Sequence, residues 1–406
     1  MHPHAAPPGA LVVGGAHVSL GLARSLGRRG IPVWLLAQHP LPRFSRYVRR
    51  CFAWPGADHP RALDVILDIA ARHDLAGWVL MATGDEDMRL VARHRAELSA
   101  HLHVATPDWE TARWTFDKRL TYRRAAALAL PTPWTAEPQA LADIERLECP
   151  FPVILKPAYR RGGDAFGAAK AWKADDRASL VALYHRAVAL RGEDAVIVQE
   201  WIPGGGEAQF SCAGLWRDGE PVALMTARRS RQYPVDFGRS STFVESVEQE
   251  EVADLACRLL ASLRYTGVAE VEFKYDAREG RFKLLDVNGR FWTWCGLGSL
   301  AGTDFPHLAW QQARGETITP CRARPGVAWM HARCDLPAAW REMRRRRLTM
   351  RDYLAGFRQP LVFASFAPDD PLPAFMELPV AAFHRLMSRP AAARQGRWRG
   401  RPAPAK

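Results

Sequence analysis

The chain has no apolar run that approaches the roughly 20 residues a membrane-spanning helix needs. Its first ten residues have no basic start, and the apolar run at residues 11–13 is too short for the core of a signal peptide. These absences predict a protein without a transmembrane segment or a leader, and we expect it in the cytoplasm.

The sequence also lacks any C-x-x-C pair. Its seven cysteines are scattered and odd in number, at positions 51, 149, 212, 257, 295, 321 and 334. This spacing is not typical of a zinc site or a disulfide framework, so reduced and mostly buried thiols are expected.

Acidic residues are scarce in only one part of the chain. The net charge is +13, but residues 320–406 alone hold 16 Arg and 1 Lys against 6 acidic residues, which leaves the remainder near neutral. A nucleic-acid surface across the whole protein is therefore not expected. The arginine cluster at residues 344–347 could bind an anionic partner, nucleic acid or a membrane surface, or could be a solvated face, which we favour. The last fifteen residues are rich in Pro, Ala, Gly and Arg, which predicts disorder.

A length of 406 residues predicts two or three domains. An apolar strand at residues 11–13 runs into Gly14 and Gly15, and a helical pattern and a second strand at residues 31–36 follow. This β-α-β order predicts a Rossmann-like unit. The glycines do not form G-x-G-x-x-G, and no acidic residue ends the second strand, so an NAD(P)-dependent enzyme is the weakest hypothesis.

Further α/β elements follow along the chain. Periodicity predicts helices at residues 61–73, 85–98, 115–128, 175–190 and 304–314, and strands at residues 77–81, 151–156, 168–172, 195–201 and 209–216.

A hairpin carries the most informative residues. Residues 271–275 and 283–290 alternate polar and apolar side chains around a turn-forming segment, which predicts two paired strands. Strand residues two apart share a face, so Asp286 and Asn288 point the same way and Glu272 on the partner strand can join them. Two carboxylates and an amide oxygen suit Mg²⁺. The alternative is a solvated hairpin whose polar residues face water.

Other polar residues stand in a definite order before this hairpin. Lys118 lies in a helical segment, Lys156 ends a strand, and a loop with Gly162, Gly163 and Gly167 follows. Gln199 and Glu200 end another strand, and Glu207 follows a run of glycines. The loop is not a Walker A motif, because no Gly-Lys-Ser/Thr follows its glycines.

Taken together, residues 10–320 resemble the ATP-grasp enzymes. The resemblance is to the carboxylate–amine ligase branch that includes D-aspartate ligase-like proteins, with biotin carboxylase and D-alanine–D-alanine ligase as more distant relatives. It implies that Lys118 and Lys156 contact ATP phosphates and that the glycine loop is a lid over them. It also implies a nucleotide pocket with Gln199, Glu200, Trp201 and Ile202 beside the adenine and Glu207 on the ribose. Glu272, Asp286 and Asn288 would bind one or two Mg²⁺, with Mn²⁺ as an alternative ion, and Arg290 would stabilise the transferring phosphoryl group.

Two features depart from the family pattern or extend it. Glu270 occupies a position that is basic in some ligases of the superfamily, so it either faces away from the site or contacts an amine. The segment at residues 228–239 holds four arginines, and we expect Arg228 and Arg231 to clamp the γ-phosphate and the carboxylate substrate. An exposed basic loop is the alternative. The aromatic residues at 291–294 could line the substrate pocket or pack in the core.

The sequence thus predicts an α/β protein, with an α+β arrangement in its grasp part. Residues 1–113 would form a Rossmann-like domain, residues 114–320 an ATP-grasp domain with lobes at 114–200 and 201–320, and residues 321–406 a basic C-terminal extension. The expected activity is ATP-dependent ligation of a small carboxylate to an amine through an acyl phosphate. A small-molecule kinase and a non-catalytic nucleotide-binding protein are the alternatives. The acid, the amine and the oligomeric state stay open, with a homodimer among the options.

Overall fold

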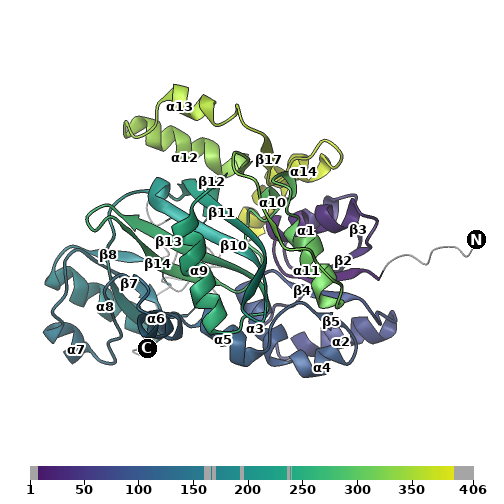
Figure 1. Ribbon diagram of the computed structural model, residues 1–406, viewed down its shortest axis with the longest axis horizontal. Helices are drawn as coiled ribbons and strands as arrows, with labels where there is room; N and C mark the ends of the chain where they lie inside the picture. The colour runs from purple at the N-terminus through teal and green to yellow at the C-terminus, as the bar shows by residue number, and fades with distance from the viewer. Residues whose placement is uncertain are drawn as a thin grey trace, which may run out of the picture.

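The structure, a computed structural model, describes residues 8–159, 166, 171–192, 196–235, 238 and 240–387. Within them the strands form three sheets, which lie in different parts of the molecule (Figure 1). The mixed α/β class expected from the sequence is confirmed.

The N-terminal sheet is parallel, with the strand order β3-β2-β1-β4-β5. Its strands are β1 (Ala10–Val13), β2 (Val33–Ala37), β3 (Val48–Ala53), β4 (Val79–Ala82) and β5 (His103–Val104). Its helices are α1 (His17–Gly27), α2 (Ala62–Arg72), α3 (Asp85–Arg93) and α4 (Arg95–Ser99), with the short turn η1 (Leu41–Phe44). The strand order reverses between β1 and β4, which is where open α/β sheets commonly bind ligands. This parallel sheet fits the predicted Rossmann-like unit, but the single helix expected at residues 85–98 is divided at His94.

The helix expected at residues 115–128 is also divided. The structure has α5 (Trp109–Phe116) and α6 (Lys118–Ala127), separated by Asp117 in an extended conformation. The Asp117 side chain accepts a hydrogen bond from the Arg119 backbone at 3.0 Å and so caps α6. The break therefore places Lys118 at the first position of a new helix.

A small antiparallel sheet follows, with the order β6-β9-β7-β8. It comprises β6 (Thr135–Ala136), β7 (Val153–Pro157), β8 (Trp172–Ala174) and β9 (Val196–Glu200), and is accompanied by α7 (Leu141–Arg146) and α8 (Arg177–Arg191). Apolar side chains of both layers form one core, which includes Val153, Leu155, Leu180 and Tyr184. The expected phosphate loop with Gly162, Gly163 and Gly167 lies outside the described residues.

The largest sheet has the order β14-β13-β10-β11-β12-β16-β17, with β15 paired to β11. Its strands are β10 (Gln209–Arg217), β11 (Glu220–Tyr233), β12 (Ser240–Val247), β13 (Gly267–Asp276), β14 (Arg281–Asn288), β15 (Cys321–Arg322), β16 (Ala328–Met330) and β17 (Leu361–Phe363). The turn η3 (Gly206–Ala208) precedes it, and α9 (Glu250–Ser262), α10 (Gly296–Leu300) and α11 (Phe305–Ala313) lie beside it. One face packs on α9 through residues such as Leu255 and Leu259. Part of the other face packs on the N-terminal domain.

The C-terminal part is built into this architecture. β16 pairs with β12 and β17 with β16, so the last strands widen the large sheet. Three helices accompany them, α12 (Ala332–Arg344), α13 (Met350–Ala355) and α14 (Leu372–Met387). Helices α12 and α13 stand at the top of Figure 1, and α14 lies beside the N-terminal domain. The predicted disorder of the last fifteen residues falls outside the described part of the chain.

Nothing among the described helices combines the length and the apolar character required to cross a membrane.

All seven cysteines are free thiols, of which Cys212 and Cys295 are buried and Cys51 is exposed. The thiols are unpaired, as expected, but the expectation that most of them are buried is wrong, because four are only partly buried.

Candidate active site

Four polar residues converge at the β13–β14 end of the large sheet. Glu270 and Glu272 lie on β13, opposite Asn288 and Asp286 on β14. The Asn288 side-chain amide donates to Glu272 at 2.9 Å and to Glu270 at 3.2 Å. The structure therefore brings Glu272, Asp286 and Asn288 together on one sheet face, and we call these three residues and Glu270 the acidic cluster.

Glu270 faces this cluster and not away from it, contrary to one of the two alternatives. It is 3% exposed and accepts a hydrogen bond from the Ser211 hydroxyl on β10 at 3.0 Å. Burial, together with the neighbouring Glu272 carboxylate, raises the pKa of Glu270 to about 7. Carboxylates crowded in this way are stabilised by a nearby cation.

Two lysines reach the cluster from other elements. The Lys118 ammonium, at the start of α6, forms an ion pair with Asp286. The Lys156 ammonium on β7 donates to the Tyr122 hydroxyl at 3.0 Å and to the Leu285 carbonyl on β14 at 3.4 Å. Burial lowers the pKa of Lys156 to about 8, against the opposing attraction of Asp286 and Glu272. Lys156 therefore spans the junction between the small and the large sheet.

Arg290 joins the cluster to the N-terminal domain. Its guanidinium donates to Asp85, the first residue of α3, at 2.6 Å and to the Asn288 amide oxygen at 3.2 Å. Between Asn288 and Arg290, a Cβ on Gly289 would overlap the Thr115 hydroxyl of α5, so glycine permits the close approach of that helix. Asp85 was not singled out by the sequence, because its partner lies 205 positions away.

Three of the four arginines of the segment at residues 228–239 lie on the strand β11, which ends at Tyr233, and Arg239 lies outside the described residues. Arg229 on β11 is buried, approaches Glu272 to 3.3 Å and donates to Gln209 at 2.7 Å. Arg228 instead pairs with Glu245 at 3.2 Å and is half-exposed.

Arg231 is directed elsewhere as well. It forms a two-pronged ion pair with Asp335 on α12, at 2.8 and 2.9 Å. The expected clamp of Arg228 and Arg231 is therefore not assembled at the cluster. The arginine that the structure places there is Arg229.

The segment linking the two sheets contains the residues expected around adenine and ribose. Glu200 is held by Lys283 at 3.0 Å and by Arg278, and it accepts from the Trp134 backbone at 3.2 Å. Gln199 donates to the Thr135 hydroxyl at 2.8 Å, and the Glu207 carboxylate accepts from the Gly205 backbone at 2.8 Å. Trp201 has the Lys173 ammonium 4.8 Å from its ring centre. The carbonyl of Ile202 accepts from Lys274 at 2.8 Å.

The aromatic residues after β14 belong to the core. Phe291, Trp292 and Trp294 are each at most 2% exposed and pack with residues of α1 and α11. They do not form an exposed wall of a substrate pocket.

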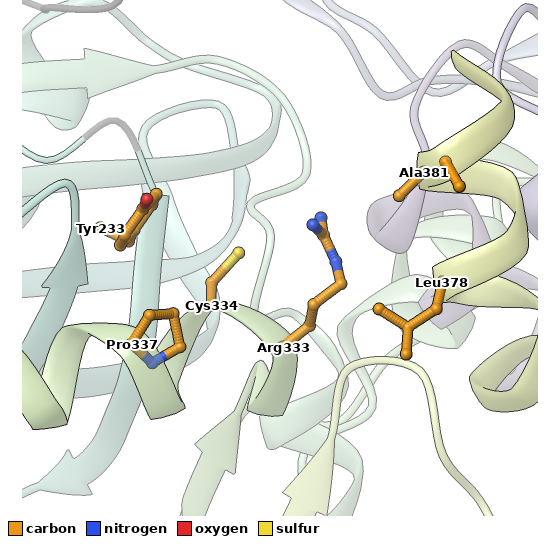
Figure 2. A pocket seen from close by; sticks show the side chains of 7 residues that line it. Tyr233, Arg333, Cys334, Pro337, Leu378 and Ala381 are labelled. Carbon is orange, nitrogen blue, oxygen red and sulfur yellow. The ribbon is translucent and has the colours of Figure 1, made fainter. Parts of the chain in front are cut away.

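A separate cavity of about 390 Å³ lies between α12 and α14. Figure 2 shows the Arg333 guanidinium standing between Tyr233 and Ala381, with Cys334 and Pro337 on the α12 side. None of the residues that line it belongs to the acidic cluster.

The cluster fits Mg²⁺ and a polyphosphate by its chemistry. Its donors to a metal are all oxygens, from three carboxylates and one amide, which is the set that Mg²⁺ prefers. Four cationic side chains surround the three carboxylates, namely Lys118, Lys156, Arg229 and Arg290. With Asp85, which pairs with Arg290, four carboxylates balance these cations, so a bound Mg²⁺ would leave net positive charge that favours an anionic ligand.

Comparisons with known proteins agree with this geometry. Residues 135–319 match the family model of the carbamoyl-phosphate synthase L chain ATP-binding domain, an ATP-grasp domain. The chain is 25% identical over 224 residues to a D-aspartate ligase of Enterococcus faecium, covering 52% of this chain and 53% of the relative. It is 26% identical over 177 residues to a D-alanine–D-alanine ligase of Alkalilimnicola ehrlichii, covering 40% and 52%. The chain thus spans about half the length of these curated relatives.

A solved structure shows the same fold. A biotin carboxylase of Campylobacter jejuni, in a β-γ-ATP complex, superposes with a TM-score of 0.61 at 15% identity, covering 76% of this chain and 71% of that one. The predicted resemblance to ATP-grasp enzymes is confirmed.

Proposed function

We propose that this chain is an ATP-grasp enzyme, an ATP-dependent ligase that joins a small carboxylic acid to an amine through an acyl phosphate. The observation that supports this most strongly is the convergence of Glu272, Asp286 and Asn288 with Lys118 and Lys156. These side chains come from four separate elements and lie where the small sheet meets the large one. Phosphoryl transfer requires cations around the phosphoryl oxygens and little covalent chemistry from the protein.

Each residue of the site has a proposed task. Lys118 and Lys156 bind and orient the triphosphate as point charges. Arg229 and Arg290 present planar guanidinium groups toward the charge that develops at the γ-phosphorus. Gln199, Glu200, Trp201, Ile202 and Glu207 hold the adenine and the ribose in the segment that links the sheets.

Glu270, Glu272, Asp286 and Asn288 would hold Mg²⁺. The bound ion would supply charge neutralisation for the phosphates. The glycine loop with Gly162 and Gly163 stays a proposed lid.

The chemistry has two steps. An oxygen of the substrate carboxylate attacks the γ-phosphorus, the bond to the β-phosphate oxygen breaks, and ADP leaves. The amine nitrogen then attacks the acyl carbon, phosphate leaves, and the nitrogen loses a proton to solvent. The N-terminal domain would supply the substrate side of the site, because Asp85 at the β4–α3 turn already contacts Arg290.

The proposed boundaries follow the same division. Residues 1–113 would be the Rossmann-like domain, and residues 114–320 the ATP-grasp domain, with lobes meeting near residue 200. The fold has no break at the proposed boundary at residue 321, because β15 and β16, which follow it, pair with strands of the large sheet. A cytoplasmic location stays a prediction.

The experiment is to measure ADP and phosphate release by the full chain with Mg²⁺, ATP and pools of carboxylic acids and amines. We expect release that requires both an acid and an amine, and expect Asp286→Asn to abolish it while the melting temperature is kept. Asp254→Asn, on the exposed side of α9, is the matched control and should keep full activity. Release with a hydroxyl compound and no amine would identify a kinase instead, and full activity of Asp286→Asn would contradict the proposed site.

A further inference from the structure

Exposed apolar side chains are concentrated in one part of the molecule. Among the described residues, thirteen large hydrophobic side chains are exposed, and ten of them lie between Leu336 and Phe383. Five of these ten lie on the segment formed by α12, α13 and their flanks. We call residues 332–358 the α12–α13 arm.

These five side chains follow helical spacing on the arm. Leu336 and Trp340 are one turn apart on α12, with 58% and 57% of their surfaces exposed. Met350 and Leu354 are one turn apart on α13 and so share a face, and the exposed Phe357 follows in the turn after the helix. An exposed apolar stripe of this kind marks a surface that binds a membrane or another protein.

The opposite side of the arm packs against the large sheet, and the exposed apolar side chains take no part in this packing. Tyr353 and Ala339 are buried against Phe243 of β12 in a small core. The buried ion pair between Arg231 and Asp335 fixes α12 to β11. The outward apolar residues therefore contribute nothing to this anchorage.

Arginines alternate with the apolar residues. The arm from Trp340 to Arg358 holds seven arginines, at positions 341, 344, 345, 346, 347, 351 and 358, against Glu342 and Asp352, so its net charge is +5. The Arg344 guanidinium lies 4.8 Å from the centre of the Trp340 ring. The cationic and the apolar groups are therefore mixed at one-turn spacing. They are not arranged as an apolar centre with a polar rim, which is the pattern of a protein interface.

We propose that the α12–α13 arm docks the protein on an anionic lipid bilayer. Trp340, Leu354 and Phe357 enter the boundary between headgroups and acyl chains, and the arginines bind lipid phosphates, which they match as planar donors. Two exposed aromatic side chains, Trp340 and Phe357, do not make the series of stacking platforms along which single-stranded nucleic acid binds. In Figure 1 the arm lies at the top edge of the molecule, with α12 next to the large sheet and α13 farther out.

The test is co-sedimentation of the full chain with phosphatidylcholine vesicles, with and without an equal part of phosphatidylglycerol. We expect binding to the anionic vesicles only, weakened by high salt. The variant Trp340→Ser/Leu354→Ser/Phe357→Ser should lower the partition coefficient at least about tenfold. The variant Arg344→Gln/Arg347→Gln should lower it about fivefold for each arginine removed.

Matched controls carry equivalent changes elsewhere on the surface. Leu190→Ser/Leu300→Ser removes exposed apolar groups, and Arg49→Gln/Arg61→Gln removes exposed charges; both should bind like the parent chain. Unchanged melting temperatures show that each variant is folded. Three results would overturn the proposal: no sedimentation with anionic vesicles, sedimentation that the arm variants leave unchanged, or a concentration-dependent dimer that the Trp340 variant dissociates while vesicles stay unbound.

Discussion

A single step along β11 separates an arginine at the acidic cluster from one that points away from it. Arg229 is buried beside Glu272, whereas Arg228 and Ser230 both contact Glu245 on the neighbouring strand. A guanidinium held at such a cluster is placed to stabilise charge on a phosphoryl group. Arg228 has no such placement.

Arg229→Ala is therefore expected to reduce the rate of ADP release by about 10²–10³-fold, the usual cost of losing one preorganised donor. Arg228→Ala should change the rate less than about threefold, because an exposed pair contributes little. Steady-state kinetics on both variants, at saturating MgATP, provide the comparison. Equal losses of rate in the two variants would contradict a role for Arg229 in the site.

Lys156 gives the site a pH dependence. Burial lowers its pKa to about 8, and a bound phosphate, which favours the charged ammonium, raises it again. ATP affinity should therefore fall as the pH rises above about 8, in addition to any change near pH 7 that Glu270 causes. Calorimetric titration with ATP at a series of pH values measures this affinity. Lys156→Met should bind more weakly and lose this alkaline decline, and a decline of the same size in the variant would show that another group causes it.

At the scale of elements, alternation along β13 and β14 was sufficient to predict which polar residues share a face. The β-α-β start and the hairpin followed from the same periodicity. The partners of the cluster were not predictable, since Lys118 and Asp286 are 168 residues apart and Arg290 and Asp85 are 205 apart. Only tertiary packing brings such pairs together.

Two local features of the backbone were also not predicted from the sequence pattern. The register of β11 is irregular between Arg229 and Arg231, so the alternation that would place both on one face is broken there. The cap at Asp117 divides what looked like one helix. The irregularity in β11 separates Arg231, which pairs with Asp335, from Arg229, which lies at the acidic cluster.

A second buried group of charges joins three helices. One oxygen of Glu377, on α14, accepts from His17 at 3.1 Å, from His331 at 2.7 Å and from Arg333 at 2.9 Å, and the other accepts from Ser365 at 2.5 Å. Glu377→Ala should lower the free energy of unfolding by about 3–5 kcal/mol, because it leaves buried charge unpaired. Glu248→Ala, at an exposed site, should change it by less than about 0.5 kcal/mol. Urea titrations measure both, and equal stabilities would contradict the role of this group.

The same group predicts how stability varies with pH. Burial lowers the pKa of His331, but hydrogen bonds with Cys334 and Glu377 outweigh it and raise that pKa to about 9. Its stabilisation is complete below its ordinary value of 6.5 and is lost as the pH rises through about 9. Burial lowers the pKa of His17, so its contribution is lost instead as the pH falls below 6.5. Unfolding free energies should therefore peak near pH 6.5 and decline on both sides of it, and His331→Gln should remove the alkaline decline.

For the whole molecule, the three sheets meet around one cluster, and Arg290 ties the N-terminal domain to it. A ligand that binds only the folded chain raises its stability, by about 2.7 kcal/mol at a hundred times its Kd. ATP with Mg²⁺ should therefore raise the melting temperature by a few degrees, and chelation of the metal should remove most of the shift. MgATP should raise the melting temperature of Asp286→Asn less than that of Asp254→Asn. Equal rises in the two variants would show that the nucleotide does not bind at the cluster.

The central claim is that the substrate carboxylate itself attacks ATP at this cluster. It is tested most directly by supplying the acid identified in the release assay with ¹⁸O in its carboxylate and measuring the isotope in the released phosphate. We expect one labelled oxygen in each phosphate, because the amine displaces the phosphate together with the oxygen that came from the acid. Phosphate that carries no label would show that the acid is never phosphorylated, and would contradict the proposed reaction.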